Sequence, residues 1–294
     1  TLYPEDAKRE GLSSILSAGM VYRGKRVGVM RVYSGQPRKF TEFEHHLLHA
    51  IANLAAAAIE DVRLEAERDE AHRVRRQVEL AADVQRRLMP RTPPRVRGFD
   101  AAGRWEPSFE LGGDFYDFIP FEHTLGVVLG DVVGKGVPAS LLMATARAAI
   151  RAHAEDTYDL DEIMAKVNSG LARDTRDNEF VTAFYGTFDN TTGRLTYCSA
   201  GHDPALLLRN GSFIELTEGG TVLGVDYNSH YDKGLVDLQV GDILFVYSDG
   251  VPDALNFNGD KFGRDRIRQA LLYASDMDAA GIVNHVLWEV RRFV

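Results

Sequence analysis

The sequence predicts an α+β protein in which largely antiparallel sheets are layered against helices, preceded by a smaller amino-terminal unit. Strand-like runs follow one another between residues 99 and 248, and pairs of helical patterns interrupt them, unlike the regular strand–helix alternation of parallel folds. A Pro-rich stretch, "PRTPPRVRGF" at residues 90–99, marks a boundary before these runs. A length of 294 residues allows two ordinary domains.

Composition excludes several classes of protein. The 34 Lys and Arg residues against 43 Asp and Glu give a net charge of -9, which disfavours nucleic acid as a partner. No apolar run approaches the roughly 20 residues that cross a bilayer, and "TLYPEDAKRE" shows no secretion leader. The single cysteine, Cys198, excludes a disulfide framework and a cysteine-based zinc site. We therefore expect a cytoplasmic protein.

The first elements are a hairpin and a helix. Residues 13–34 read as two strands joined at "YRGKR". Thr41, with Glu44 three residues later, predicts a capping box at the start of the helix. Apolar residues at three- and four-residue steps then form a stripe that we expect to pack on the hairpin. The stripe consists of Leu47, Ile51, Leu54, Ala58 and Val62.

This helix is predicted to continue to residue 89 as a linker. Its apolar pattern nearly dissolves in "RLEAERDEAHRVRR" (residues 63–76) and then recovers before Pro90 ends it. The seam is narrow, as in coiled coils, so we expect a homodimer formed through this helix. The alternative is a solvated helix docked on its own domain. The recovered seam consists of Val74, Val78, Ala81 and Leu88.

After residue 90 the pattern predicts seven strands and four helices. We expect Cys198, in one of these strands, to pack as a small buried hydrophobe. The glycines of "GDVVGKGVP" match neither a dinucleotide fingerprint nor a Walker loop. The strands are expected at 99–105, 114–121, 125–131, 180–188, 194–200, 204–209 and 242–248, and the helices at 137–155, 159–174, 263–272 and 276–292.

Three of these strand-like runs end in aspartate followed by a turn. They are "LGGDFYD" with Asp114 and Asp117, "GVVLGDVVGKG" with Asp131, and "DILFVYSDGV" with Asp249. Mg²⁺ and Mn²⁺ prefer oxygen ligands, and glycine beside the acid leaves room for a metal and for backbone carbonyls. Each aspartate alone is explained as well by turn capping. The three together favour a shared site, in which two ions about 4 Å apart would activate water and neutralise a phosphoryl group.

A histidine and two serines are the other residues that could have a catalytic role. His202, in "AGHDP", ends a strand, where a lone histidine is more often structural than catalytic. Ser140 and Ser248 lack the strand-to-helix setting of a nucleophile elbow, so the sequence does not favour serine hydrolase chemistry.

Taken in order, these motifs resemble the bacterial branch of the metal-dependent (PPM, type 2C) serine/threonine phosphatases, typified by stage II sporulation protein E. The blocks are "ELGGDFYDF", "GDVVGKGVPASLLMA", "FVTAFYGTFDNTTGRLTYCSAGHDPALLL", "LGV" and "LQVGDILFVYSDGVPDALNFNGDKFG", within residues 77–294. The resemblance implies a sandwich of antiparallel sheets flanked by helices. It also implies two Mn²⁺ or Mg²⁺ ions and a metal-bound water as nucleophile, with no catalytic nucleophile from the protein.

The resemblance also implies roles for particular residues. Asp131 corresponds to the acid that bridges both metals, and the carbonyl of Val132 to a backbone ligand beside it. Asp114 corresponds to a ligand of one metal and Asp249 to a ligand of the other. Three residues remain candidates for supporting or substrate-binding roles: Asp117, His202 and Gly250. The family closes its site with a further aspartate in an Asp-Asp pair, and this chain ends at "WEVRRFV" before such a motif. A missing tail is favoured over a damaged enzyme, because the last helix stops without a cap or turn.

The amino-terminal piece resembles the second half of a GAF sensor domain. The resembling segment runs from "EGLSSILSAGMVYRGKRVGVMRVYS" to "AIANLAAAAIE". We therefore expect a partial sensor domain at 1–62, a linker helix at 63–89 and a phosphatase domain at 90–294 that lacks its last strand.

The resemblance implies a phosphatase of bacterial signalling that removes phosphate from a phosphoserine or phosphothreonine protein. The expected substrate is an anti-sigma-factor antagonist of the STAS type, with the sensor acting through the helix. The alternative is a module that binds a phosphoprotein without hydrolysis.

Overall fold

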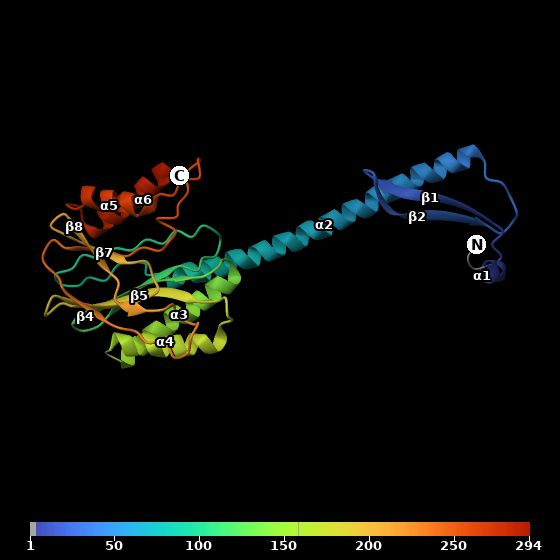
Figure 1. Ribbon diagram of the computed structural model, residues 1–294. Helices are drawn as coiled ribbons and strands as arrows, with labels where there is room; N and C mark the ends of the chain where they lie inside the picture. Colours follow the sequence, from blue (N-terminus) through green and yellow to red (C-terminus); the bar gives the residue numbers. More distant parts are fainter. Residues whose placement is uncertain (1–3, 158) are drawn as a thin grey trace. The chain divides into compact units, whose positions relative to one another are not determined.

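The computed structural model describes residues 4–157 and 159–294, and its chain divides into two compact units, residues 1–77 and 78–294. The long helix α2 (Glu42–Leu88) contributes residues to both units (Figure 1). The three-part division expected from the sequence, with a separate linker at 63–89, stays a prediction.

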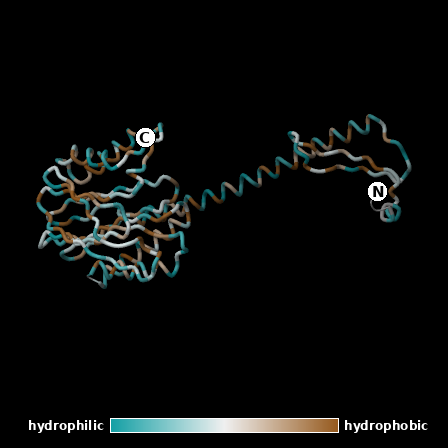
Figure 2. The backbone as a smooth tube through the Cα atoms, viewed as in Figure 1, coloured by the Kyte–Doolittle hydropathy of each residue, from teal (hydrophilic) through white to brown (hydrophobic). Residues whose placement is uncertain are grey.

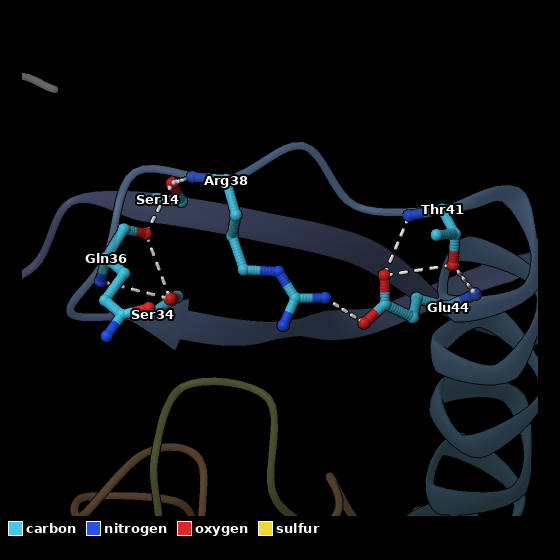
Figure 3. A network of polar contacts seen from close by, with 6 residues as sticks. All are labelled: Ser14, Ser34, Gln36, Arg38, Thr41 and Glu44. Carbon is cyan, nitrogen blue, oxygen red and sulfur yellow. Dashed lines mark hydrogen bonds and ion pairs between the residues drawn. The ribbon is translucent and has the colours of Figure 1, made fainter.

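The first unit is a short helix, a hairpin and the first part of α2. α1 (Pro4–Arg9) precedes β1 (Ser14–Tyr22) and β2 (Lys25–Ser34), which pair antiparallel. The capping box is confirmed, because the Thr41 amide donates to Glu44 Oε2 at 2.7 Å and the Glu44 amide donates to Thr41 Oγ1 at 3.3 Å. Arg38 pairs with the same glutamate, and Ser14 accepts a hydrogen bond from the Arg38 amide (Figure 3).

The predicted packing face of α2 on the hairpin is wrong. Of the predicted stripe, Leu54 and Val62 are 73% and 68% exposed. The buried face is instead built from Leu48, Ala52 and Ala56, which pack against three residues of β1. Alanine allows the helix backbone to approach the hairpin closely, so the narrow alanine face forms the contact and the larger side chains face outward. The residues of β1 in this core are Leu16, Ala18 and Met20.

The second unit has four layers, helices, sheet, sheet and helices (Figure 1). The larger sheet has the order β10-β6-β5-β4-β3, with β9 paired parallel to β6, and the smaller sheet has the order β11-β7-β8. The strands are β3 (Phe115–Pro120), β4 (Thr124–Val132), β5 (Val181–Asp189), β6 (Arg194–Ala200), β7 (Ala205–Arg209), β8 (Ser212–Leu216), β9 (Gly219–Gly220), β10 (Gly234–Asp237) and β11 (Ile243–Phe245). The helices are α3 (Val137–Asp156), α4 (Leu160–Asp174), α5 (Gly263–Tyr273) and α6 (Ala279–Phe293).

Each interface between layers has its own apolar core. Helices α3 and α4 bury residues such as Met143 and Val167 against the larger sheet, and α5 and α6 bury residues such as Ile267 and Val286 against the smaller sheet. The sheets meet around a third cluster that includes Phe184. Hydrophobic positions are frequent along these strands (Figure 2). The predicted α+β sandwich is confirmed.

A cavity of about 500 Å³ lies beside the third core. Its lining includes Val127 of β4, Leu244 of β11 and Val286 of α6. Strand β11, which lies at the edge of its sheet, therefore borders this cavity.

Two details of the strand prediction need correction. Residues 99–105 form no strand; Phe99 makes only an isolated bridge to Val96. Tyr116 holds this segment instead, because its hydroxyl lies 3.2 Å from the carbonyl oxygens of both Pro90 and Gly103. The short strands β8, β9 and β10 were not predicted, since two to five residues give little periodicity.

Cys198 is fully buried in the core between the larger sheet and its helices, as expected for a small hydrophobe. Among the described residues, no helix is both long enough and apolar enough to span a membrane.

Candidate metal centre

The register of the β3–β4 hairpin brings two of the predicted metal ligands together. Phe115 lies opposite Gly130, so one step further along the same register Asp114 lies opposite Asp131. Directly opposed residues of an antiparallel pair have Cβ atoms about 4.5–5.5 Å apart. The Asp114 carboxyl is close enough to that of Asp131 to raise the pKa of Asp131. Asp114 and Asp131 therefore form a contacting acidic pair.

The glycines before these acids are required by close packing. A Cβ atom on Gly130 would lie 2.5 Å from the Phe115 ring, and one on Gly113 would lie 2.6 Å from the Val132 carbonyl oxygen. The sequence suggested that these glycines leave room for a metal. In the structure their space belongs to Phe115 and to the Val132 carbonyl, so the glycines let the two strand ends approach each other.

The third predicted ligand reaches the pair from the other sheet. Asp249 follows β11, and the preceding Ser248 donates a hydrogen bond from Oγ to Asp114 Oδ2 at 2.9 Å. Partial burial and repulsion from Asp114 raise the pKa of the Asp249 carboxyl. The segment that carries Asp249 is thus tied directly to the acidic pair.

Crowded negative charge shifts the ionisation of the pair. Burial, the contact with Asp114 and repulsion from Asp249 and Asp203 together raise the pKa of Asp131 from 3.8 to about 8. A divalent cation would remove this strain by favouring the ionised carboxylates. Oxygen ligands of this type suit Mg²⁺ or Mn²⁺.

The acids do not form a closed metal cage. Within residues 4–157 and 159–294, no three His, Cys, Asp or Glu side chains lie in an arrangement that could hold an ion. The donor set fits a hard cation in its chemistry, with two neighbouring carboxylates, a third acid on the segment tied to them, and the Val132 carbonyl oxygen close to Gly113.

Asp117 lies in a separate group of ion pairs. It is almost fully buried, and its Oδ2 accepts from Arg147 at 2.9 Å and from Arg151 at 2.7 Å, both on α3. Its Oδ1 accepts from the Phe118 amide at 2.9 Å. Asp117 therefore joins β3 to α3, and these contacts do not support a role beside the metal.

His202 lies buried between the two sheets. Its Nε2 is 3.1 Å from the Tyr247 carbonyl oxygen and its Nδ1 is 2.8 Å from Thr182 Oγ1. Burial lowers the pKa of the imidazole, which favours the neutral ring. Gly250 lies at the exposed end of the same segment, beyond Asp249.

Four residues near the acids make contacts that the sequence does not predict. Asp203 pairs with Arg264, and its charge acts on both Asp131 and Asp249. Gln85, near the end of α2, is buried; its Nε2 donates to the Gly112 carbonyl at 2.6 Å and its Oε1 accepts from the Gly112 amide at 3.1 Å. Thr182 and Ser248 complete the set. The sequence could have pointed to Ser248 and Asp203, because each is next to a predicted site residue, but it could not have pointed to Gln85 or Thr182.

The sequence model of the stage II sporulation protein E family matches residues 122–293, which is more than half of the chain. The chain belongs to this family. A GAF-domain model matches residues 2–60. The resemblances noted in the sequence are thereby confirmed.

Curated relatives agree with this assignment. "Phosphoserine phosphatase RsbU" of Bacillus subtilis is 28% identical over 188 residues, which cover 63% of this chain and 56% of the relative. "Phosphoserine phosphatase RsbP" of the same organism is 24% identical, over 61% of this chain and 46% of the relative. The chain thus spans about half the length of these relatives.

A solved structure supports the fold alone. The "SiaA-PP2C domain of Pseudomonas aeruginosa" superposes with a TM-score of 0.65 at 20% identity, covering 76% of this chain and 92% of that one.

Proposed function

We propose that this protein is a metal-dependent serine/threonine phosphatase that acts on a phosphoserine or phosphothreonine of another protein. The observation that carries the proposal is the convergence of Asp114 and Asp131 from one hairpin with the Asp249 segment of the other sheet, in a chain of this family. Acids that repel each other without a cation are costly to maintain, and a metal-dependent reaction gives them a purpose.

Two Mn²⁺ or Mg²⁺ ions would be held by the carboxylates of Asp114, Asp131 and Asp249 and by the Val132 carbonyl. When bound, they would supply Lewis acidity to a phosphoryl group and lower the pKa of water. The chain itself orients these ligands. Ser248 fixes one oxygen of Asp114, and Phe115 against Gly130 holds the hairpin register. Ser140 and Ser248 lack the setting of a protein nucleophile.

The test is Mn²⁺-dependent release of phosphate from a phosphoserine protein by the whole chain. Asp131→Ala should reduce turnover by at least about 100-fold, because it removes the residue proposed to serve both ions. Asp237→Asn is a suitable control, since this acid is exposed on β10 and its carboxylate pairs with Arg194 at the surface. Turnover that needs no metal, or that Asp131→Ala leaves intact, would refute the phosphatase proposal.

The proposed substrate is an anti-sigma-factor antagonist of the STAS type. Its support is the likeness to two relatives that are named phosphoserine phosphatases. Hydrolysis of phosphorylated STAS proteins at rates well above those for an unrelated phosphoserine protein would support this assignment. Equal rates would refute it.

The GAF-like unit is proposed to control the site through α2. Near the end of this helix, Gln85 binds both backbone groups of Gly112, two residues before Asp114. A change in this part of the helix would therefore reach a proposed metal ligand through two hydrogen bonds. Activity that is the same with and without residues 1–76 would contradict this control.

Dimerisation through α2 is proposed as part of the same control. Val74 of the predicted seam is exposed, and so are Leu54 and Val62 earlier on the helix, consistent with an apolar face that is free to pair. Light scattering should give twice the chain mass for the whole protein, and half that value for Leu54→Glu with Val62→Glu. A monomeric wild-type protein would refute it.

A second candidate is a module that binds a phosphoprotein without hydrolysing it. The specific observation in its favour is that the described acids do not form a closed three-ligand group. This reading predicts phosphoprotein binding with no turnover in Mn²⁺, and equal binding by Asp131→Asn.

A further inference from the structure

His202 is a buried side chain whose two ring nitrogens are both engaged. A carbonyl oxygen only accepts hydrogen bonds, so the Nε2 that lies 3.1 Å from the Tyr247 carbonyl must carry the hydrogen. In the neutral ring Nδ1 then accepts, and Thr182 Oγ1 donates to it at 2.8 Å. Neither nitrogen is left to bind a metal ion or to exchange a proton with a substrate.

The two partners of His202 belong to the two sides of the candidate site. Thr182 lies opposite Asp131 in the β4–β5 ladder, and its hydroxyl is 3.5 Å from the Asp131 carbonyl oxygen. Tyr247 lies two residues before Asp249. The imidazole therefore links β5, the neighbour of the strand that carries Asp131, to the segment that carries Asp249.

The loop that carries His202 is itself fixed. Ser199 Oγ donates to the His202 carbonyl at 3.3 Å, and the next residue, Asp203, pairs with Arg264 of α5. The backbone on both sides of the imidazole is thus anchored, so the ring can transmit the position of one sheet to the other.

We propose that His202 is a positioning residue that sets the separation of Asp131 and Asp249 and thereby the affinity of the site for divalent metal. The proposal rests on the proposed function. Strand β11 has only three residues and lies at the edge of its sheet, so without the bond from His202 to Tyr247 the Asp249 segment would be held less firmly near the pair. A metal ion would then have to reorganise the site at the cost of binding free energy.

The test is Mn²⁺ binding by isothermal titration calorimetry to the whole chain and to three variants. His202→Phe retains an aromatic ring and removes both hydrogen bonds. Thr182→Val removes one hydroxyl with little change in shape. Thr187→Val is the matched control on β5, five residues along and also partly buried. We expect Mn²⁺ affinity to fall about 10- to 100-fold in His202→Phe, to fall less in Thr182→Val, and to stay unchanged in the control.

Turnover separates positioning from catalysis. If His202 acts only through spacing, kcat should recover at saturating Mn²⁺ while the half-saturating Mn²⁺ concentration stays raised. His202→Gln should recover part of the affinity, because its amide nitrogen can donate to the Tyr247 carbonyl. If kcat stays low at saturating metal while the affinity is normal, the positioning role is refuted.

A spectroscopic test needs neither metal nor substrate. Long-range ¹H–¹⁵N NMR of the metal-free protein should show His202 as the neutral tautomer with the proton on Nε2. A proton on Nδ1 alone would overturn the bridge.

The outcomes separate the two proposals. Wild-type protein that binds Mn²⁺, together with folded variants that bind it equally well, refutes the role of His202 alone. Wild-type protein that binds no Mn²⁺ refutes both proposals. If His202→Phe does not fold, Thr182→Val decides, because unchanged affinity in that variant overturns the role of His202.

Discussion

Replacing Asp131 by asparagine should stabilise the metal-free protein at neutral pH, although it removes a proposed metal ligand. The carboxyl of Asp131 lies against that of Asp114, and its pKa is raised from 3.8 to about 8. At pH 7 the folded metal-free chain therefore holds a proton that the unfolded chain has lost. Asparagine has no such proton to lose, and its amide can still donate to Asp114.

The size of the gain follows from proton linkage. One pKa unit corresponds to about 1.4 kcal/mol, so the distance from the ordinary pKa to pH 7 would give at most about 4 kcal/mol. The carboxyl is partly exposed to water, which screens the interaction, so we expect about 1–2 kcal/mol. Because the pKa is raised in the folded state, the stability of the wild type falls as pH rises from 3.8 toward about 8. The advantage of the variant should therefore vanish near pH 4.

Urea unfolding followed by circular dichroism in EDTA, at about pH 4.5 and at pH 7, measures this difference. Asp237→Asn serves as the control. In excess Mn²⁺ the order should reverse, because only the wild type gains the full stabilisation from binding. A variant that is no more stable than wild type at pH 7, or equally stabilised at both pH values, would refute the reasoning.

Three further predictions follow from contacts in the second unit. Asp117→Asn should lower the free energy of unfolding by about 3 kcal/mol, because it leaves buried arginine charge unpaired. Arg151→Met should lower it less, because Arg151 is partly exposed. Urea unfolding of both variants measures the difference, and equal losses would contradict this prediction. Gln85→Leu should lower the free energy of unfolding by about 1–3 kcal/mol, because it removes both hydrogen bonds to the backbone of Gly112. It should also raise the Mn²⁺ concentration needed for turnover, and an unchanged concentration would argue against coupling through α2. Gly219→Ala should prevent normal folding, because the added Cβ would lie 1.8 Å from the Ser199 carbonyl oxygen. A variant with a native circular dichroism spectrum and melting temperature would refute this prediction.

The hairpin that brings Asp114 and Asp131 together can be predicted from the sequence. "GGDFYDF" and "GDVVGKG" flank a short turn, so pairing the two strands places Asp114 near Asp131. Strand alternation also separates Asp117 from this pair, since it shares the face of Phe115 and Ile119 that packs toward α3. The sequence left Asp117 as a candidate because it could not show that arginines from α3 reach that face.

Contacts between segments far apart in the chain could not be predicted from the sequence. The bridge from Thr182 through His202 to Tyr247 depends on how the two sheets pack, which periodicity does not encode. The error on α2 has a similar origin. Its larger apolar residues form a convincing stripe, but the hairpin packs on the alanine face, because small side chains allow the closest approach.

The two halves of the candidate site differ in how firmly they are built. Asp131 lies in a nine-residue strand inside the larger sheet, whereas Asp249 follows a three-residue edge strand beside the cavity. Local opening costs least where contacts are few, so the β11 segment should exchange its amide hydrogens faster than β4 in the metal-free protein. Brief excursions of this one segment would separate the acids while the larger sheet stays folded. The lifetime of a bound ion would then be governed by how often the β11 segment opens.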